Sequence, residues 1–85
     1  GRMTEQDLEK AIKLKEELDY DRKLLKFAMK PSVELNVMLR ENEKYGDVFC
    51  MNRVLGDEGI KEIKGKIIAI INDEIHNLES QIEKL

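Results

Sequence analysis

The sequence predicts an α+β domain in which a long helix, a β-hairpin and a second long helix follow one another. Three observations support this fold class. Apolar residues recur at steps of three and four towards both ends of the chain, which is the spacing of one helix face. Between these ends, apolar and polar residues alternate from Val33 to Arg40, as in a half-buried strand. Pro31 and Gly56 separate the three segments.

The length of the chain predicts self-association. A chain of 85 residues forms one domain, and a domain of this size buries only a modest share of its unfolded surface. We therefore expect a second subunit to contribute further burial. Residues 1–3 are interpreted as a cloning remnant, Gly1 and Arg2, followed by a native start at Met3, which leaves residues 4–85 as the single domain.

The first helix is expected over residues 4–29. Thr4 is a suitable N-cap, Asp7 suits the positive end of the helix dipole, and Pro31 ends the helix because proline has no amide proton. Two apolar stripes run along this helix, so we expect it to contact more than one neighbour. The first stripe is Ala11, Leu14, Leu18, Leu25 and Ala28, and the second stripe is Leu8, Ile12, Leu24 and Phe27.

The β-hairpin is expected over residues 32–55. Its first strand alternates, its turn is the polar stretch from Glu41 to Gly46, and its second strand runs from about Asp47 to Leu55. Cys50 lies in that strand among apolar residues, where a buried thiol would act as a small hydrophobe. Two strands alone are marginally stable in water, so the hairpin should need a helix layer or further strands.

The second helix is expected over residues 57–85, with Asp57 as its N-cap. Gly65 inside it costs about 1 kcal/mol relative to alanine, which predicts the close approach of another backbone. The isoleucine-rich stretch from Lys66 to Ile71 is also compatible with a third strand. Helix is preferred because a heptad-like seam continues through this stretch, and we predict that it joins subunits: Ile68, Ile71, Ile75, Leu78, Ile82 and Leu85.

The lengths of these elements predict how they pack. Each helix of about 26 residues spans about 40 Å, whereas a strand of about eight residues spans only about 27 Å. A small hairpin therefore cannot cover two such helices. We expect the helices to pair antiparallel, and the surplus apolar surface and an open strand edge to pack against a second copy.

Composition argues against several classes of function. The net charge of −3 and the pI near 5.2 give no general attraction to nucleic acid or anionic lipid. One cysteine excludes an internal disulfide and fits a cytoplasmic protein. The longest apolar run, Ile67 to Ile71, is too short to cross a bilayer. No membrane association is therefore expected.

Candidate catalytic and metal-binding residues are few. His76 is the single histidine. A zinc site formed by His76 with Asn72 or Asp73 and Ser80 would have only one strong nitrogen ligand and no cysteine, which is a poor combination of ligands for zinc. Pairing Cys50 with His76 as a nucleophile and base would require the hairpin to dock on the wrong face of the second helix. Acidic residues between Gly56 and Gly59 disfavour phosphate binding there. We therefore expect no enzyme activity, no cofactor and no metal.

Basic residues offer two binding hypotheses. Arg22, Lys26 and Lys30 lie four apart on one face of the first helix, so nucleic-acid binding through this face is a third-ranked function. In an oligomer, these residues could meet others at a subunit interface and hold a small anionic or nucleotide-like ligand. The set of possible contacts for that ligand is Arg22, Lys26, Lys30, Arg40, Arg53 and Tyr45.

The chain begins with an acidic cap and EKAIKLKEEL at residues 9–18, and it ends with a Glu-rich and Lys-rich coiled-coil stretch from Ile75 to Leu85. In these features it resembles small phage-encoded or prophage-encoded helix-hairpin-helix proteins of unassigned function. The resemblance implies an accessory role and interaction with a host protein. The leading prediction is thus a non-enzymatic homo-oligomer, at least a dimer, that binds another protein, and the alternative is an oligomer that sequesters a small ligand.

Overall fold

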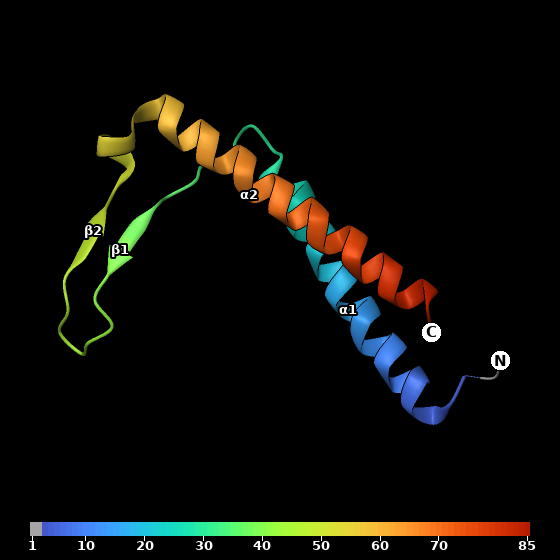
Figure 1. Ribbon diagram of the computed structural model, residues 1–85. Coiled ribbons are helices and arrows are strands. Elements are labelled where there is room, and N and C mark those ends of the chain that lie inside the picture. Colours follow the sequence, from blue (N-terminus) through green and yellow to red (C-terminus); the bar gives the residue numbers. More distant parts are fainter. Residues whose placement is uncertain (1–2) are drawn as a thin grey trace.

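The computed structural model describes residues 3–85 as two long helices joined by a short antiparallel hairpin (Figure 1). The elements are α1 at Glu5–Ala28, β1 at Met38–Arg40, β2 at Val48–Cys50 and α2 at Asn52–Glu83. The predicted α-β-β-α order is confirmed. The start of α1 and the end of α2 lie at the same end of the helix pair, so the helices are antiparallel, as expected (Figure 1). The predicted cloning remnant, residues 1–2, lies outside the described residues.

Helix α1 begins and ends where local chemistry predicts. The Thr4 hydroxyl accepts a hydrogen bond from the Asp7 amide at 3.0 Å, and the Asp7 carboxylate accepts one from the Thr4 amide at 3.2 Å. This reciprocal capping box satisfies two amides that the helix cannot satisfy. At the other end, the Met29 amide donates to the Leu25 carbonyl at 3.0 Å, and the chain then turns at Lys30 and Pro31.

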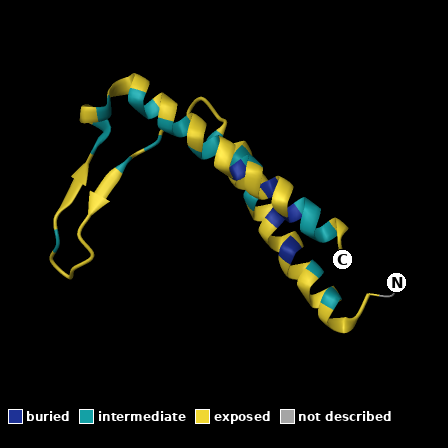
Figure 2. Ribbon diagram, in the orientation of Figure 1, coloured by how far each residue is buried: buried dark blue, intermediate teal, exposed yellow. Residues whose placement is uncertain are grey.

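The core is one narrow contact between the two helices. Leu14 and Leu18 of α1 pack with Ile71, Ile75 and Leu78 of α2, and these five residues are the buried core of the described chain (Figure 2). Leu78 is the most completely covered, with 2% of its surface exposed. Because each helix contributes a single stripe to this core, the remaining faces of both helices are largely in contact with solvent.

The predicted subunit seam faces α1 of the same chain. Ile71, Ile75 and Leu78 are buried, and Ile82 and Leu85 are partly buried against the same cluster. The expectation that one chain cannot cover this ridge is wrong for its buried middle, because α1 runs antiparallel along it. Ile68, the remaining seam residue, is only partly exposed. Oligomerisation stays a prediction, and Ile71, Ile75 and Leu78 are already covered within one chain.

The second apolar stripe of α1 is uncovered. Leu8, Ile12, Leu24 and Phe27 are all exposed, because α2 packs on the neighbouring stripe. Within residues 3–85, α1 therefore has one packing partner where the sequence predicted more than one. The second neighbour, if there is one, must come from outside the chain.

Helix α2 begins earlier than predicted. The sequence placed its start at Asp57, whereas the helix starts at Asn52 and bends at Gly56, where φ is 69° and ψ is 173°. This backbone region is essentially restricted to glycine. Residues 52–55 contain no helix breaker, so they form a helical turn before the bend. Residues 66–71 are helical, which decides the open choice between helix and strand.

The strands are shorter than predicted because residues 52–55 belong to α2. Met38 pairs with Cys50, Leu39 with Phe49 and Arg40 with Val48. Continued in this register, residues 33–36 would lie opposite residues 52–55, which are helical and cannot pair. Val33, Leu35 and Val37 are nevertheless half-buried between exposed neighbours, so the predicted alternation of burial is present without a strand.

Gly65 gives a direct test of the packing around α2. The sequence predicted a close backbone there, but a Cβ at Gly65 would meet none of the described atoms within 4 Å. Gly65→Ala should therefore raise the free energy of unfolding by about 1 kcal/mol through helix propensity, measured by urea titration. Gly56→Ala should lower it, because φ of 69° is strained for alanine. A destabilised Gly65→Ala variant would contradict the open surroundings of this residue.

Candidate functional site

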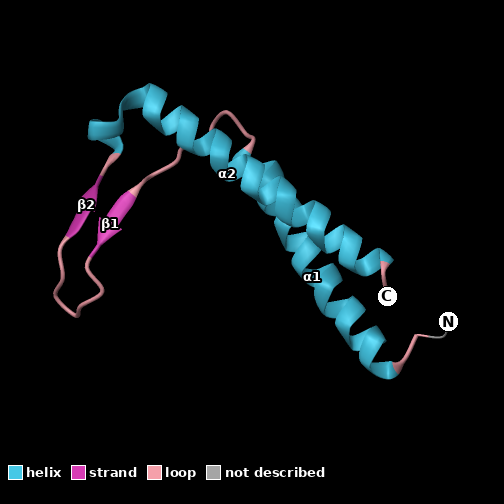
Figure 3. Cartoon of the chain, viewed as in Figure 1, coloured by secondary structure: helices cyan, strands magenta, loops and turns pink. Residues whose placement is uncertain are grey.

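The hairpin extends away from the helices (Figure 3). It carries exposed apolar side chains on both of its faces. Alternation along the strands puts Leu39 and Phe49 on one face and Met38 and Val48 on the other. Leu39 is 59% exposed and Phe49 is 65% exposed. A two-stranded hairpin with neither face covered is marginally stable in water. Exposed apolar surface of this kind is typical of sites that bind another molecule.

Asn52 fixes the base of the hairpin. Its side-chain carbonyl accepts from the Val37 amide at 2.9 Å, and its side-chain amide donates to the Leu35 carbonyl at 2.8 Å. The Met51 amide adds a bond to the Val37 carbonyl at 2.7 Å. These bonds join the chain before β1 to the start of α2. They hold the hairpin at an angle that carries its tip away from the helix pair (Figure 1).

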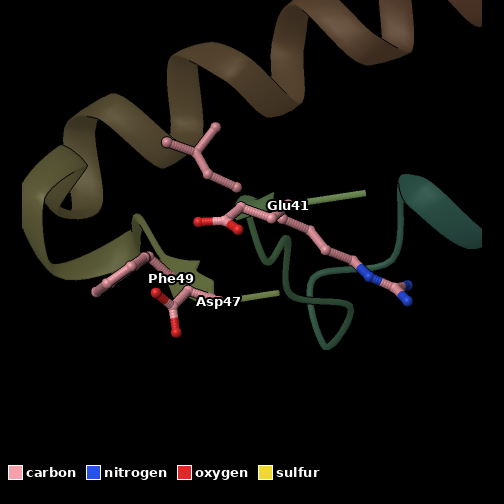
Figure 4. Close-up of a pocket in the computed structure, with 5 residues that line it drawn as sticks. Glu41, Asp47 and Phe49 are labelled. Carbon is pink, nitrogen blue, oxygen red and sulfur yellow. The ribbon is translucent and has the colours of Figure 1, made fainter. Parts of the chain in front are cut away.

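Towards the tip of the hairpin, the face that carries the Phe49 ring is acidic. Glu41 and Asp47 continue the face that carries Leu39 and Phe49, and all four line a shallow hollow of about 250 Å³ together with Arg40 (Figure 4). Gly46 lets the turn close, because a Cβ there would lie 2.6 Å from the Glu41 Cβ and 2.9 Å from the Glu41 carbonyl oxygen. The tip thus presents an apolar pair followed by two carboxylates.

A second feature is an apolar groove at the end of the helix pair where α1 leads into the connection before β1. It encloses about 290 Å³. We call this hollow the groove, and its apolar walls are formed by Leu24 and Phe27 of α1, Val33 and Leu35 of the connection, and Ile67 and Ile71 of α2. Such a volume is close to the lower limit of ligand pockets, which start at about 300 Å³.

Lys64 holds the groove together at its polar edge. Its ammonium donates to the Val33 carbonyl at 2.6 Å and lies 3.5 Å from the Lys30 carbonyl oxygen. These bonds fasten the connection onto α2, so that Val33 forms part of the groove wall. Glu34 also lines the groove. The Lys30 ammonium lies 5.8 Å from the centre of the Phe27 ring, within cation–π range.

The predicted anion contacts are not gathered at one place in a single chain. Arg22, Lys26 and Lys30 belong to α1 and its C-terminal turn, Arg40 and Tyr45 to the hairpin, and Arg53 to the first turn of α2. Arg22 forms an exposed ion pair with Glu79 at 3.4 Å. Such surface pairs contribute at most about 1 kcal/mol. A ligand site that combines these residues across subunits stays a prediction.

The residues considered for catalysis lie in the open. His76 is exposed, with its Nδ1 atom 3.6 Å from a carboxylate oxygen of Glu79. Cys50 is also exposed, so the expectation of a buried thiol is wrong, because no helix covers the hairpin. Among residues 3–85, no group of three or more His, Cys, Asp and Glu side chains is placed to hold a metal ion.

Comparison with protein-family models, with curated proteins and with solved structures finds no match for this chain. The resemblance to small phage proteins therefore stays a prediction. In the described part of the chain, neither helix combines the length and the apolar character needed to cross a membrane.

Sequence reasoning missed the two polar residues that shape the site. The predicted second strand, from about Asp47 to Leu55, included Asn52, and Lys64 had no predicted role. A signal for Asn52 exists in hindsight, because a polar amide directly follows the apolar run from Val48 to Met51. Lys64 gives no such signal, since its role depends on carbonyl groups about 30 residues earlier in the chain.

Removing the Asn52 side chain should release the hairpin. Asn52→Ala leaves the Val37 amide and the Leu35 carbonyl without partners, so the free energy of unfolding should fall by about 1–3 kcal/mol. Hydrogen exchange at the Val37 amide should become faster. Asn36→Ala is the matched control, because Asn36 is exposed and makes only the 3.3 Å contact to Asn52. Equal stability of the two variants would contradict the anchoring role of Asn52.

Proposed function

We propose that this chain is a non-enzymatic, homo-oligomeric interaction protein, at least a dimer. The observation that supports this proposal is the amount of surface that one chain leaves open. The described fold measures 55 × 34 × 17 Å, with a radius of gyration of 17.9 Å. A compact domain of this length would have a radius of gyration of about 12 Å.

The solvent-accessible area also shows that one chain is less compact than a typical monomer, and this area can be compared with the area buried in an interface. The chain exposes 7530 Å², whereas a compact monomer of its mass would expose about 5,200 Å². The excess of about 2,300 Å² exceeds the roughly 800 Å² that each partner buries in a standard protein–protein interface. Much of the open surface is apolar and belongs to the hairpin and to the second stripe of α1. A second copy is the simplest partner for this surface, because it is present wherever the protein itself is present.

Binding to another protein is the proposed role of the oligomer. The outer helix faces carry mixed charges, which suits a specific and reversible contact more than a permanent one. The resemblance to phage accessory proteins adds a host protein as the proposed target. The overall negative charge disfavours nucleic acid as the main partner.

Light scattering at several concentrations tests this function. We expect a mass of at least twice 9.9 kDa, because a second copy covers the apolar surface that one chain exposes. A thermal-shift screen with nucleotides and small anions accompanies it, and we expect no rise in the melting temperature. A mass of one chain even at high concentration would contradict the proposal. A rise with one ligand would instead favour the ligand-sequestering alternative.

A further inference from the structure

We propose that the hairpin of one copy seats Leu39 and Phe49 in the groove of a second copy, and that the second hairpin does the same in return. This inference rests on the proposed homo-oligomer and names its contact. Each chain then supplies one arm, the hairpin, and one receptor, the groove. The groove is complete only when a partner copy fills it.

The hairpin cannot fill the groove of its own chain. Val33 and Leu35 form one wall of the groove, and the hairpin begins at Met38, directly after Val37, whose amide is bound by Asn52. The bonds of Asn52 and the bend at Gly56 direct the strands away from the helix pair (Figure 1). A hairpin that reaches the groove must therefore belong to another molecule.

The sizes of the arm and the groove agree. A cavity of about 150 Å³ is enough to hold a benzene ring. The groove, at about 290 Å³, has room for the Phe49 ring and for a branched side chain beside it. Leu39 is the direct cross-strand neighbour of Phe49, so the two side chains enter as a pair. The walls that they meet are aliphatic, apart from the Phe27 ring.

The charges agree as well. Glu41 and Asp47 follow Leu39 and Phe49 on the same face of the arm. Lys64 lines the groove, the Lys30 ammonium lies over its Phe27 wall, and Lys61 lines the adjoining hollow together with Lys64. These three ammonium groups outnumber the single carboxylate of Glu34. The arm's hollow also includes Arg40, so an arm that seats its apolar pair brings two carboxylates and one guanidinium, a net negative charge, to this basic rim.

Reciprocal docking closes the assembly. In a two-fold dimer, each surface of one chain meets the complementary surface of the other, so both arms and both grooves are used. No arm is left over to recruit a third copy. The same contact covers one face of the hairpin and part of the open stripe of α1, which are the surfaces that one chain leaves bare.

Mixing two damaged variants tests this arrangement. Phe49→Asp spoils the arm and Phe27→Asp spoils the groove, so each variant alone loses both contacts of its dimer. A mixed dimer keeps one undamaged arm in one undamaged groove. If one lost contact weakens the dimer about tenfold, each variant weakens it about 100-fold, and the mixture recovers about tenfold. Sedimentation of the two variants, alone and mixed in equal amounts, measures this recovery.

Controls separate docking from folding. Ile70→Asp places the same charge on another exposed apolar position, outside the arm and the groove, and should leave the dimer intact. Phe49→Ala and Phe27→Ala replace the aspartate pair if circular dichroism shows that either aspartate variant loses helix. With these variants the same recovery on mixing is expected.

Three outcomes would overturn the inference. If both variants stay dimeric, the dimer uses another surface and the proposed function still stands. If each variant is monomeric and mixing restores nothing, each surface pairs with its own kind, as in hairpin-to-hairpin contact. If the unaltered chain is itself monomeric, the proposed function fails together with the inference.

Discussion

A narrow contact between two antiparallel helices holds this molecule together. Five aliphatic side chains form it, and each helix contributes one stripe. Burial of each such side chain is worth about 1.5–3 kcal/mol, so this contact fixes the helix pair but leaves little in reserve for other elements. Everything outside the contact must be held by local bonds or by a second molecule. The hairpin and the second apolar stripe of α1 are the largest parts that lie outside this contact.

Two residues, Gly56 and Asn52, direct the hairpin away from the helix pair, so that it does not pack on the helices. Gly56 bends the start of α2 through a backbone conformation that other residues avoid. Asn52 ties the chain before β1 to that start, which fixes the direction of the strands. A hairpin packed on the helices would have given a compact monomer. The observed geometry instead separates an apolar arm from an apolar groove.

The order of the elements could be predicted because strong local signals define it. Thr4, Asp7 and Pro31 set the ends of α1, and the spacing of Ile71, Ile75 and Leu78 sets the buried face of α2. These signals depend on neighbours within one or two helical turns. The sequence also showed correctly that α1 has a second apolar stripe, and the structure shows that stripe to be exposed.

What could not be predicted depends on contacts between distant segments. Whether α1 or a second copy covers Ile75 is decided by the path of the chain, since the spacing is the same in either case. The prediction that Cys50 is buried was wrong, because an apolar stretch indicates that burial would be favourable but does not show which segment packs on it. The groove brings together three segments, so no local pattern indicates it.

One chain leaves apolar surface exposed on the hairpin and on α1, and we propose that a second copy covers it. The melting temperature measured over a range of protein concentrations distinguishes an oligomer from a stable single chain, because unfolding that separates subunits depends on concentration. If a second copy covers this surface, the melting temperature should rise by about 4 °C for each tenfold increase in protein concentration. A cooperative transition whose melting temperature does not depend on concentration would show that the single chain is stable by itself and needs no second copy.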